Sequence, residues 1–347
     1  MNPALFFGII LIALGAFSSG SFAVPFGKIK GWQWETYWMI FSLGAYILFP
    51  LAACLVFAPG YLSIIGATSA KTVWSVFLLG AVYGIGNLSF GLALRYLGLS
   101  LGYALSLGLM LAIGTLIPPM IDGRLDLMMH NRGGMQLISG VIIATVGIAL
   151  SAWAGILKDK HISQLKKEET IGEFNLIKGL IAALVVGITG SAMSLGFEQG
   201  LPISEMAAKQ GVDPLFTMMP VLIVLFSGTF ITTIVWCLYL GSKNKSLKNY
   251  LNAKSPLILS SNYLYALLAG VLWFGQFIVY GMGKSKMGPF TFTSWGILMA
   301  LTIVFATVWG VIRKEWKGAP LKVYILMAFS LAIIIVSSFI IGISGSE

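Results

Sequence analysis

Residues 73–94 read VWSVFLLGAVYGIGNLSFGLAL, a run without a single charged side chain. A helix rises about 1.5 Å per residue and the hydrocarbon core of a bilayer is about 30 Å thick, so roughly 20 residues of this kind cross it. Nine further runs have this length and apolar character, at 4–26, 37–58, 99–121, 136–156, 179–201, 214–240, 261–282, 290–312 and 323–343. The sequence therefore predicts an all-α polytopic membrane protein with ten transmembrane helices.

The composition of the chain agrees with this prediction. Of its 347 residues, 58% are hydrophobic and 10% are charged, and the mean hydropathy is +0.91. Soluble domains carry about 25% charged residues. An ordinary soluble enzyme is therefore excluded.

The net charge of +10 could suggest a nucleic-acid partner, but the basic residues are distributed by topology. If the ten runs alternate across the bilayer, 16 of the 22 Lys and Arg residues fall in the odd-numbered connections. This asymmetry is the positive-inside pattern. It predicts that both termini lie outside the cytoplasm, and it explains the basic excess by topology without a nucleic-acid partner. The first run is kept as a helix, because Lys28 follows it and no basic residue precedes it, the reverse of a signal peptide.

The longest internal hydrophilic stretch divides the chain into two sets of five runs. Residues 158–178 read KDKHISQLKKEETIGEFNLIK and are interpreted as a cytoplasmic linker. They separate a first five-helix repeat, 1–157, from a second, 179–347. Because each half has an odd number of spans, homologous halves would be inverted relative to each other.

An offset of 190 residues tests for such a repeat. It places Gly80 on Gly270, Tyr83 on Trp273 and Gly98 on Gly288. Inverted repeats are typical of secondary transporters, whose substrate site lies between the halves near the middle of the bilayer. Glycines four apart, such as Gly80 and Gly84, are most simply interpreted as helix-packing positions.

Enzyme and metal chemistry find little support in the sequence. The two histidines, His130 and His161, lie in connections on opposite faces. Cys54 and Cys237 both lie within predicted spans, where a thiol usually fills space. We expect no enzyme activity, no metal and no cofactor.

The spans do contain aromatic rings and uncharged hydrogen-bonding groups, which suit a small neutral polyol. The amides of Asn87 and Gln276 stand out because a buried amide has four hydrogen-bonding positions to satisfy. Serine and threonine in membrane helices often bond only their own backbone. The full set of candidate substrate-binding residues is Asn87, Gln276, Tyr83, Trp273, Trp295, Tyr280 and Ser19.

Two carboxylates are candidates for proton coupling. Glu198 is the one charged residue within a predicted span, and intramembrane acids commonly mark function. It lies close to Pro202, so an interfacial position is the alternative. Glu35, in GWQWETYW, opens the second span and is most simply a partner of the helix dipole. The tryptophans around it are most simply an interfacial belt, and a gating or substrate role is the alternative.

Several segments together resemble one family. They are VPFGKIKGWQWETYW (24–38), GIGNLSFGLALRYLGLSLG (84–102), GTLIPPMIDG (114–123), GEFNLIKGL (172–180), GVDPLF (211–216), WFGQFIVYGMG (273–283) and RKEW (313–316). These strings are similar to the L-rhamnose/proton symporter family of the drug/metabolite transporter superfamily. The resemblance implies ten helices in two inverted repeats, and uptake of a deoxy sugar across the bacterial inner membrane driven by inward proton movement, with both termini in the periplasm.

The ninth span departs from the family pattern at Thr291 and Thr293, where polar and acidic side chains are expected. A different sugar or a different coupling ion is therefore left open, and sodium is not excluded. The expected partners are the lipid bilayer and a small neutral sugar, with no obligate protein partner. Two other functions remain: an exporter of metabolites or drugs on the same fold, and a sensor that binds sugar without moving it.

Overall fold

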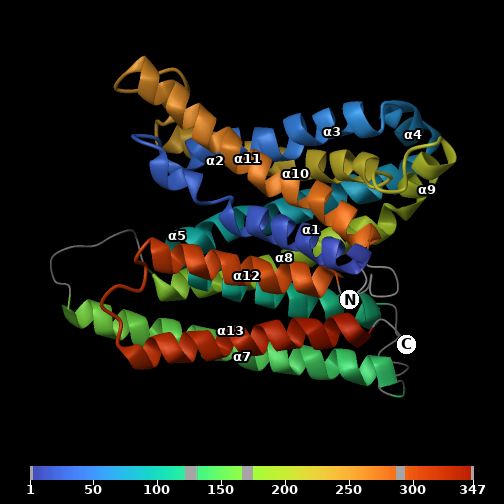
Figure 1. Cartoon of the computed structure of the whole chain (residues 1–347). Coiled ribbons are helices and arrows are strands. Elements are labelled where there is room, and N and C mark those ends of the chain that lie inside the picture. Colours follow the sequence, from blue (N-terminus) through green and yellow to red (C-terminus); the bar gives the residue numbers. More distant parts are fainter. Residues whose placement is uncertain (1–2, 122–129, 131, 166–174, 287–293, 345–347) are drawn as a thin grey trace. The chain divides into compact units, whose positions relative to one another are not determined.

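The computed structural model describes residues 3–121, 130, 132–165, 175–286 and 294–344. Over these ranges every regular element is a helix (Figure 1). In chain order they are α1 (Pro3–Ser21), η1 (Pro25–Lys28), α2 (Trp34–Leu43), the π-helical turn η2 (Gly44–Leu48), α3 (Phe49–Phe57), α4 (Tyr61–Ala67), α5 (Ala70–Ile121), α7 (Arg132–Leu165), α8 (Leu176–Gln199), α9 (Leu201–Lys209), α10 (Met219–Lys243), η3 (Leu247–Tyr250), α11 (Pro256–Ser285), α12 (Ser294–Ile312) and α13 (Leu321–Ser344).

Seven helical segments in these ranges are long and apolar enough to cross a membrane. Two shorter apolar helices, Ile297–Ile312 and Leu321–Ser337, follow them. The prediction of an all-helical, polytopic membrane protein is confirmed. The finer arrangement of ten helices in two inverted repeats stays a prediction.

The third and fourth predicted spans both lie in α5, which consists of two helices joined across a kink. The helix is interrupted within it at Gly98, whose backbone has φ 79° and ψ 178°. Side chains are essentially excluded from this region of backbone conformation, so a glycine is required. The break falls between residues 94 and 99, where the two predicted spans meet.

The chain forms two compact units, and each draws helices from both halves of the sequence. The first unit comprises Met1–Gly20, Gly86–Ser191 and Met282–Glu347, and the second comprises Ser21–Ile85 and Ala192–Gly281. The first residues of the predicted linker, up to Leu165, continue α7, and residues 166–174 lie outside the described ranges. The division into a first repeat, a linker and a second repeat stays a prediction.

In the first unit, α7 and α13 pack along each other, and α12 lies against α13 (Figure 1). Ser151 of α7 and Ser330 of α13 share a hydrogen bond of 2.8 Å in the middle of this pair. A hydroxyl pair of this kind satisfies polar groups where lipid cannot. The fifth and tenth predicted spans are therefore neighbours.

In the second unit, glycines let α5 and α10 approach closely. A side chain at Gly80 would collide with the carbonyl of Leu225, and one at Gly228 would collide with the carbonyl of Phe77. The Thr229 hydroxyl donates to the Gly80 carbonyl at 3.0 Å. The packing role predicted for Gly80 is confirmed, because small residues permit backbone contact between membrane helices.

Candidate functional site

One face of α11 carries three of the predicted residues, Trp273, Gln276 and Tyr280, because positions three and four apart are neighbours on a helix. Trp273 is buried among aromatic rings, with centroids 5.0 Å from Tyr46 and 5.1 Å from Phe226. Gln276 is also buried, and its Nε2 donates to the Trp273 carbonyl at 2.8 Å. That bond uses one of the four positions of the amide, so Gln276 retains capacity for a ligand.

Asn87 lies in the part of α5 that belongs to the first unit, and its side chain is 2% exposed. Its Oδ1 has no hydrogen-bond partner within the described part of the chain. Leaving a buried acceptor unsatisfied costs about 1–3 kcal/mol. A buried amide kept at such a cost is a strong candidate for binding a hydroxyl.

Ser19, a second predicted residue of the first unit, is buried, and its backbone carbonyl makes a hydrogen bond. Its carbonyl accepts a hydrogen bond of 2.7 Å from the Tyr103 hydroxyl. The Tyr103 ring packs edge-on against Phe90, with centroids 5.1 Å apart. This contact ties α1 to α5 beyond the Gly98 break.

Glu35 is a buried carboxylate in the first turn of α2, with 4% of its surface exposed. Its Oε1 accepts a hydrogen bond of 2.7 Å from the Ser246 hydroxyl and one of 3.0 Å from Nδ2 of Asn244. Both donors are neutral. Within the described ranges, this buried carboxylate is therefore held by hydrogen bonds from neutral groups.

The two donors to Glu35 lie in the turn that ends α10. Lys245, between them, has a left-handed backbone with φ 55°. The Ser246 N–H bonds to the Gly241 carbonyl at 2.9 Å, which closes the end of the helix. The tight turn is what brings Asn244 and Ser246 to the same oxygen.

A second set of hydrogen bonds stabilises the end of the second unit where Glu35 lies. Asn262 of α11 exchanges two hydrogen bonds with the backbone of Lys30, at 3.0 and 2.8 Å. The Tyr250 carbonyl accepts from the Tyr263 hydroxyl at 2.8 Å. Burial, then the nearby Cys237 and Glu35, raise the pKa of the Tyr250 phenol. Tyr250 therefore stays neutral beside Glu35 at physiological pH.

The tryptophans near Glu35 are packed inside the protein. Trp38 is 1% exposed, and its ring stacks on Trp34 with centroids 5.1 Å apart. Trp32 is buried between Tyr250 and Tyr263. The interpretation of these residues as an interfacial belt is wrong, because a belt residue would turn its ring toward the lipid headgroups.

The remaining predicted residues are distributed as follows. Glu198 lies exposed in the last turn of α8, and Tyr83 is buried in the second unit. The side chain of Trp295, together with Thr291 and Thr293, lies outside the described residues. Each unit holds its own part of the predicted set: Ser19 and Asn87 in the first, and Tyr83, Trp273, Gln276, Tyr280, Glu35 and Glu198 in the second.

Glu315 has a structural role that the sequence analysis did not predict, although the residue lies in the quoted motif RKEW. Its carboxylate accepts from the backbone N–H groups of Leu99 at 3.0 Å and Ser100 at 3.3 Å. These groups open the helical segment after the Gly98 break, so Glu315 acts as an N-terminal cap supplied from the turn that follows α12. Its neighbour Trp316 lies under the ammonium group of Lys158, 4.7 Å from the ring centroid.

The chain is similar to known transport proteins over its whole length. Residues 1–346 match the family model described as L-rhamnose-proton symport protein. The chain is 34% identical over 346 residues to the L-rhamnose-proton symporters of Yersinia pestis (strain Pestoides F) and Klebsiella pneumoniae subsp. pneumoniae. The same identity is found with that of Yersinia pseudotuberculosis serotype O:1b. In each case the match covers 99% of both chains.

Proposed function

Because the chain belongs to the L-rhamnose-proton symport protein family, we propose that it imports L-rhamnose, or a closely related sugar, together with a proton. The observation that carries this proposal is the match over 99% of both chains to named symporters. A family of transporters also agrees with the several apolar spans and the largely uncharged, aromatic interior. The chain is thus a transporter and not an enzyme.

The proposed fold has ten helices in two inverted five-helix repeats. Gly80 and Gly270, which the offset of 190 residues pairs, support it. Gly80 of the third span lies against the backbone of α10, the seventh span. Gly270 of the eighth span lies against the backbone of α2 and η2, the second span: a Cβ there would be 3.1 Å from the Phe41 carbonyl. Corresponding glycines thus meet corresponding helices, as a repeat requires.

The proposed sugar site uses Asn87 and Gln276 as hydrogen-bonding groups, Tyr83, Trp273, Trp295 and Tyr280 as stacking rings, and Ser19 as a further polar member. The unsatisfied Oδ1 of Asn87 supports this assignment most directly. Sugar hydroxyls donate to amide oxygens, and C–H faces of sugars pack on aromatic rings. Rocking of inverted halves would open such a site to each side in turn.

For proton coupling we favour Glu35 over Glu198. Glu35 is buried with two neutral donors, whereas Glu198 is exposed. A carboxylate affects a conformational equilibrium through its charge only where burial makes that charge costly. Protonation of Glu35 would weaken its bonds to the turn after α10, which links coupling to movement of that helix end.

The proposed location is the bacterial inner membrane, with both termini in the periplasm. The charge distribution supports this orientation, since 16 of the 22 basic residues would then face the cytoplasm. The turn that holds Glu35 belongs to this basic side, with Lys243, Lys245 and Lys248 nearby. Glu35 would thus lie at the cytoplasmic end of its helix.

The test is uptake of radiolabelled L-rhamnose into proteoliposomes, with and without an imposed inward proton gradient. Accumulation that depends on the gradient and is blocked by excess unlabelled rhamnose would support the proposal. Accumulation that depends on a sodium gradient and not on a proton gradient would show that sodium is the coupling ion. Outward-driven movement would favour an exporter, and binding without accumulation would favour a sensor.

A further inference from the structure

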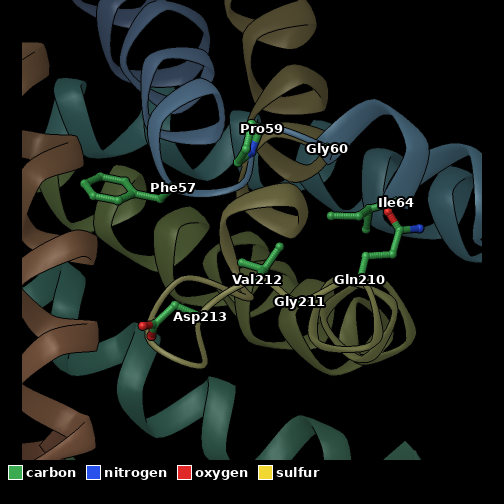
Figure 2. Close-up of a pocket in the computed structure, with 8 residues that line it drawn as sticks. All are labelled: Phe57, Pro59, Gly60, Ile64, Gln210, Gly211, Val212 and Asp213. Carbon is green, nitrogen blue, oxygen red and sulfur yellow. The ribbon is translucent and has the colours of Figure 1, made fainter.

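A small pocket lies at one end of the second unit, between the connection that follows α3 and the connection that precedes α10 (Figure 2). Its volume is about 160 Å³. Phe57, Pro59, Gly60 and Ile64 line one side, and Gln210 to Asp213 line the other. Drug-sized ligands need pockets of about 300 Å³ or more, so this one suits only a small molecule.

Local backbone chemistry shapes this pocket. α9 ends at Lys209, and Gly211 follows it with φ 84°, a conformation that favours glycine. The Val212 N–H bonds to the Ala207 carbonyl at 3.1 Å, which folds the chain back. Oδ1 of Asp213 accepts from the Leu215 N–H at 2.8 Å, which fixes the carboxylate. The turn therefore presents Gln210 and Asp213 on either side of Val212 (Figure 2).

The chemistry of the eight lining residues is that of a polyol site. They include one carboxylate, one amide and no basic residue, so an anionic ligand is disfavoured. The amide and carboxylate accept from hydroxyls, and the amide also donates. Phe57, Pro59 and Val212 supply apolar surface for a C–H face, and the Phe57 ring is held by stacking on Phe216 at 4.1 Å.

The pocket lies at the end of the spanning helices opposite to Glu35. α2 and α3 run from Trp34 to Phe57, and α10 begins at Met219 on the pocket side and ends at Lys243. The connections at the pocket end carry two basic residues, Lys71 and Lys209, whereas the turn at the other end is rich in lysine. By the positive-inside rule, the pocket faces the periplasm.

We propose that this pocket is an outer subsite that captures the sugar before it reaches the transport site. This inference rests on the proposed function.

Residue Gly60 allows the inference to be tested, because its backbone has φ −84° and tolerates any side chain. A Cβ there would contact only Oε1 of Gln210, at 3.7 Å. Gly60→Trp should therefore fill the pocket without strain. Gly66→Trp is the matched control, because a Cβ at the exposed Gly66 of α4 meets nothing within 4 Å.

The experiment measures initial uptake of radiolabelled L-rhamnose by intact cells that express each variant, because cells present the protein in one orientation. Gly60→Trp should lower uptake several-fold at sugar concentrations well below KM and leave the saturated rate unchanged. Gly66→Trp should change neither. Asp213→Asn keeps the acceptor for Leu215 and removes the charge, and it should raise KM by about threefold to tenfold. Size-exclusion profiles of the purified variants check folding.

The outcomes separate the two proposals. If the unmodified protein takes up no rhamnose, the proposed function and the subsite both fail. If it takes up rhamnose and Gly60→Trp matches Gly66→Trp at every concentration, the subsite alone is wrong. An equal loss at low and saturating sugar in a correctly folded Gly60→Trp protein would also overturn capture, because a capture site affects KM and not the saturated rate.

Discussion

The Ser246 hydroxyl donates a 2.7 Å hydrogen bond to the buried carboxylate of Glu35 across 211 positions of sequence. The bond joins the turn after α10 to the first turn of α2, and Asn244 of the same turn adds a second donor. Hydrogen bonds and the positive end of a helix dipole both stabilise a buried carboxylate. The same contact therefore joins α2 to the end of α10 and gives the buried carboxylate of Glu35 a hydrogen-bond donor.

Glu35→Gln should abolish coupling while preserving the fold. The glutamine oxygen can still accept from Ser246 and Asn244, so the helix ends stay joined, but the side chain can no longer take up a proton. We expect gradient-driven rhamnose accumulation to fall at least tenfold, with exchange of labelled for unlabelled sugar at equal concentrations retained.

The matched control for this change is Glu198→Gln, which should leave both measurements close to those of the unmodified protein because Glu198 is exposed. Retained accumulation in Glu35→Gln together with loss in Glu198→Gln would assign coupling to Glu198.

Ser246→Ala should destabilise the protein. A hydrogen bond to a charged group contributes about 1.5–3 kcal/mol, and its loss leaves the buried carboxylate with Asn244 alone. The check is the thermal unfolding midpoint of detergent-solubilised protein. Ser260→Ala is the control, because Ser260 is exposed and bonds only the Leu257 carbonyl within its own helix. Equal midpoints for the two variants would contradict a stabilising role for the Ser246 bond.

The helices could be predicted from sequence because the bilayer imposes a local rule. A run of about 20 uncharged residues must satisfy its backbone within its own helix, whatever its neighbours are. Contact between helices could be predicted where it depends on small residues, as at Gly80 against α10. Gly98 lies between the predicted runs 73–94 and 99–121, but the sequence does not give the backbone angles of the kink at this position.

The partners of the carboxylates could not be predicted in this way. Glu35 bonds to residues 209 and 211 positions away, and Glu315 bonds to backbone N–H groups more than 200 positions away. No periodicity along one helix reports such contacts. The burial of Trp38 is similar: tryptophan at the end of a span suits both a lipid interface and a packed helix terminus. Only the positions of Trp34 and Phe41, which flank it in the fold, decide between them.

Asn87→Leu should separate stability from function. Leucine is close to asparagine in size and removes the acceptor that has no partner in the described part of the chain. The free energy of unfolding should therefore stay the same or rise by about 1 kcal/mol at most, and the thermal midpoint should stay or rise with it. Rhamnose uptake should be lost, because the amide that we propose to bind the sugar is gone. A lower midpoint with uptake retained would show that Asn87 serves the fold and not the sugar.

Gly98→Ala should destabilise the first unit. With φ 79° and ψ 178°, the position is strained for any side chain, at a cost of about 1–3 kcal/mol. The new Cβ would also lie 2.8 Å from Oε2 of Glu315 and would displace the carboxylate from the Leu99 and Ser100 N–H groups.

Gly66→Ala, in an exposed helical position with nothing within 4 Å, should instead stabilise by about 0.5–1 kcal/mol. Opposite shifts of the thermal midpoint are therefore expected, and the double variant Gly98→Ala with Glu315→Ala should not recover stability, because the backbone strain remains. Recovery would show that the collision with Glu315, and not the backbone conformation, requires glycine at this break.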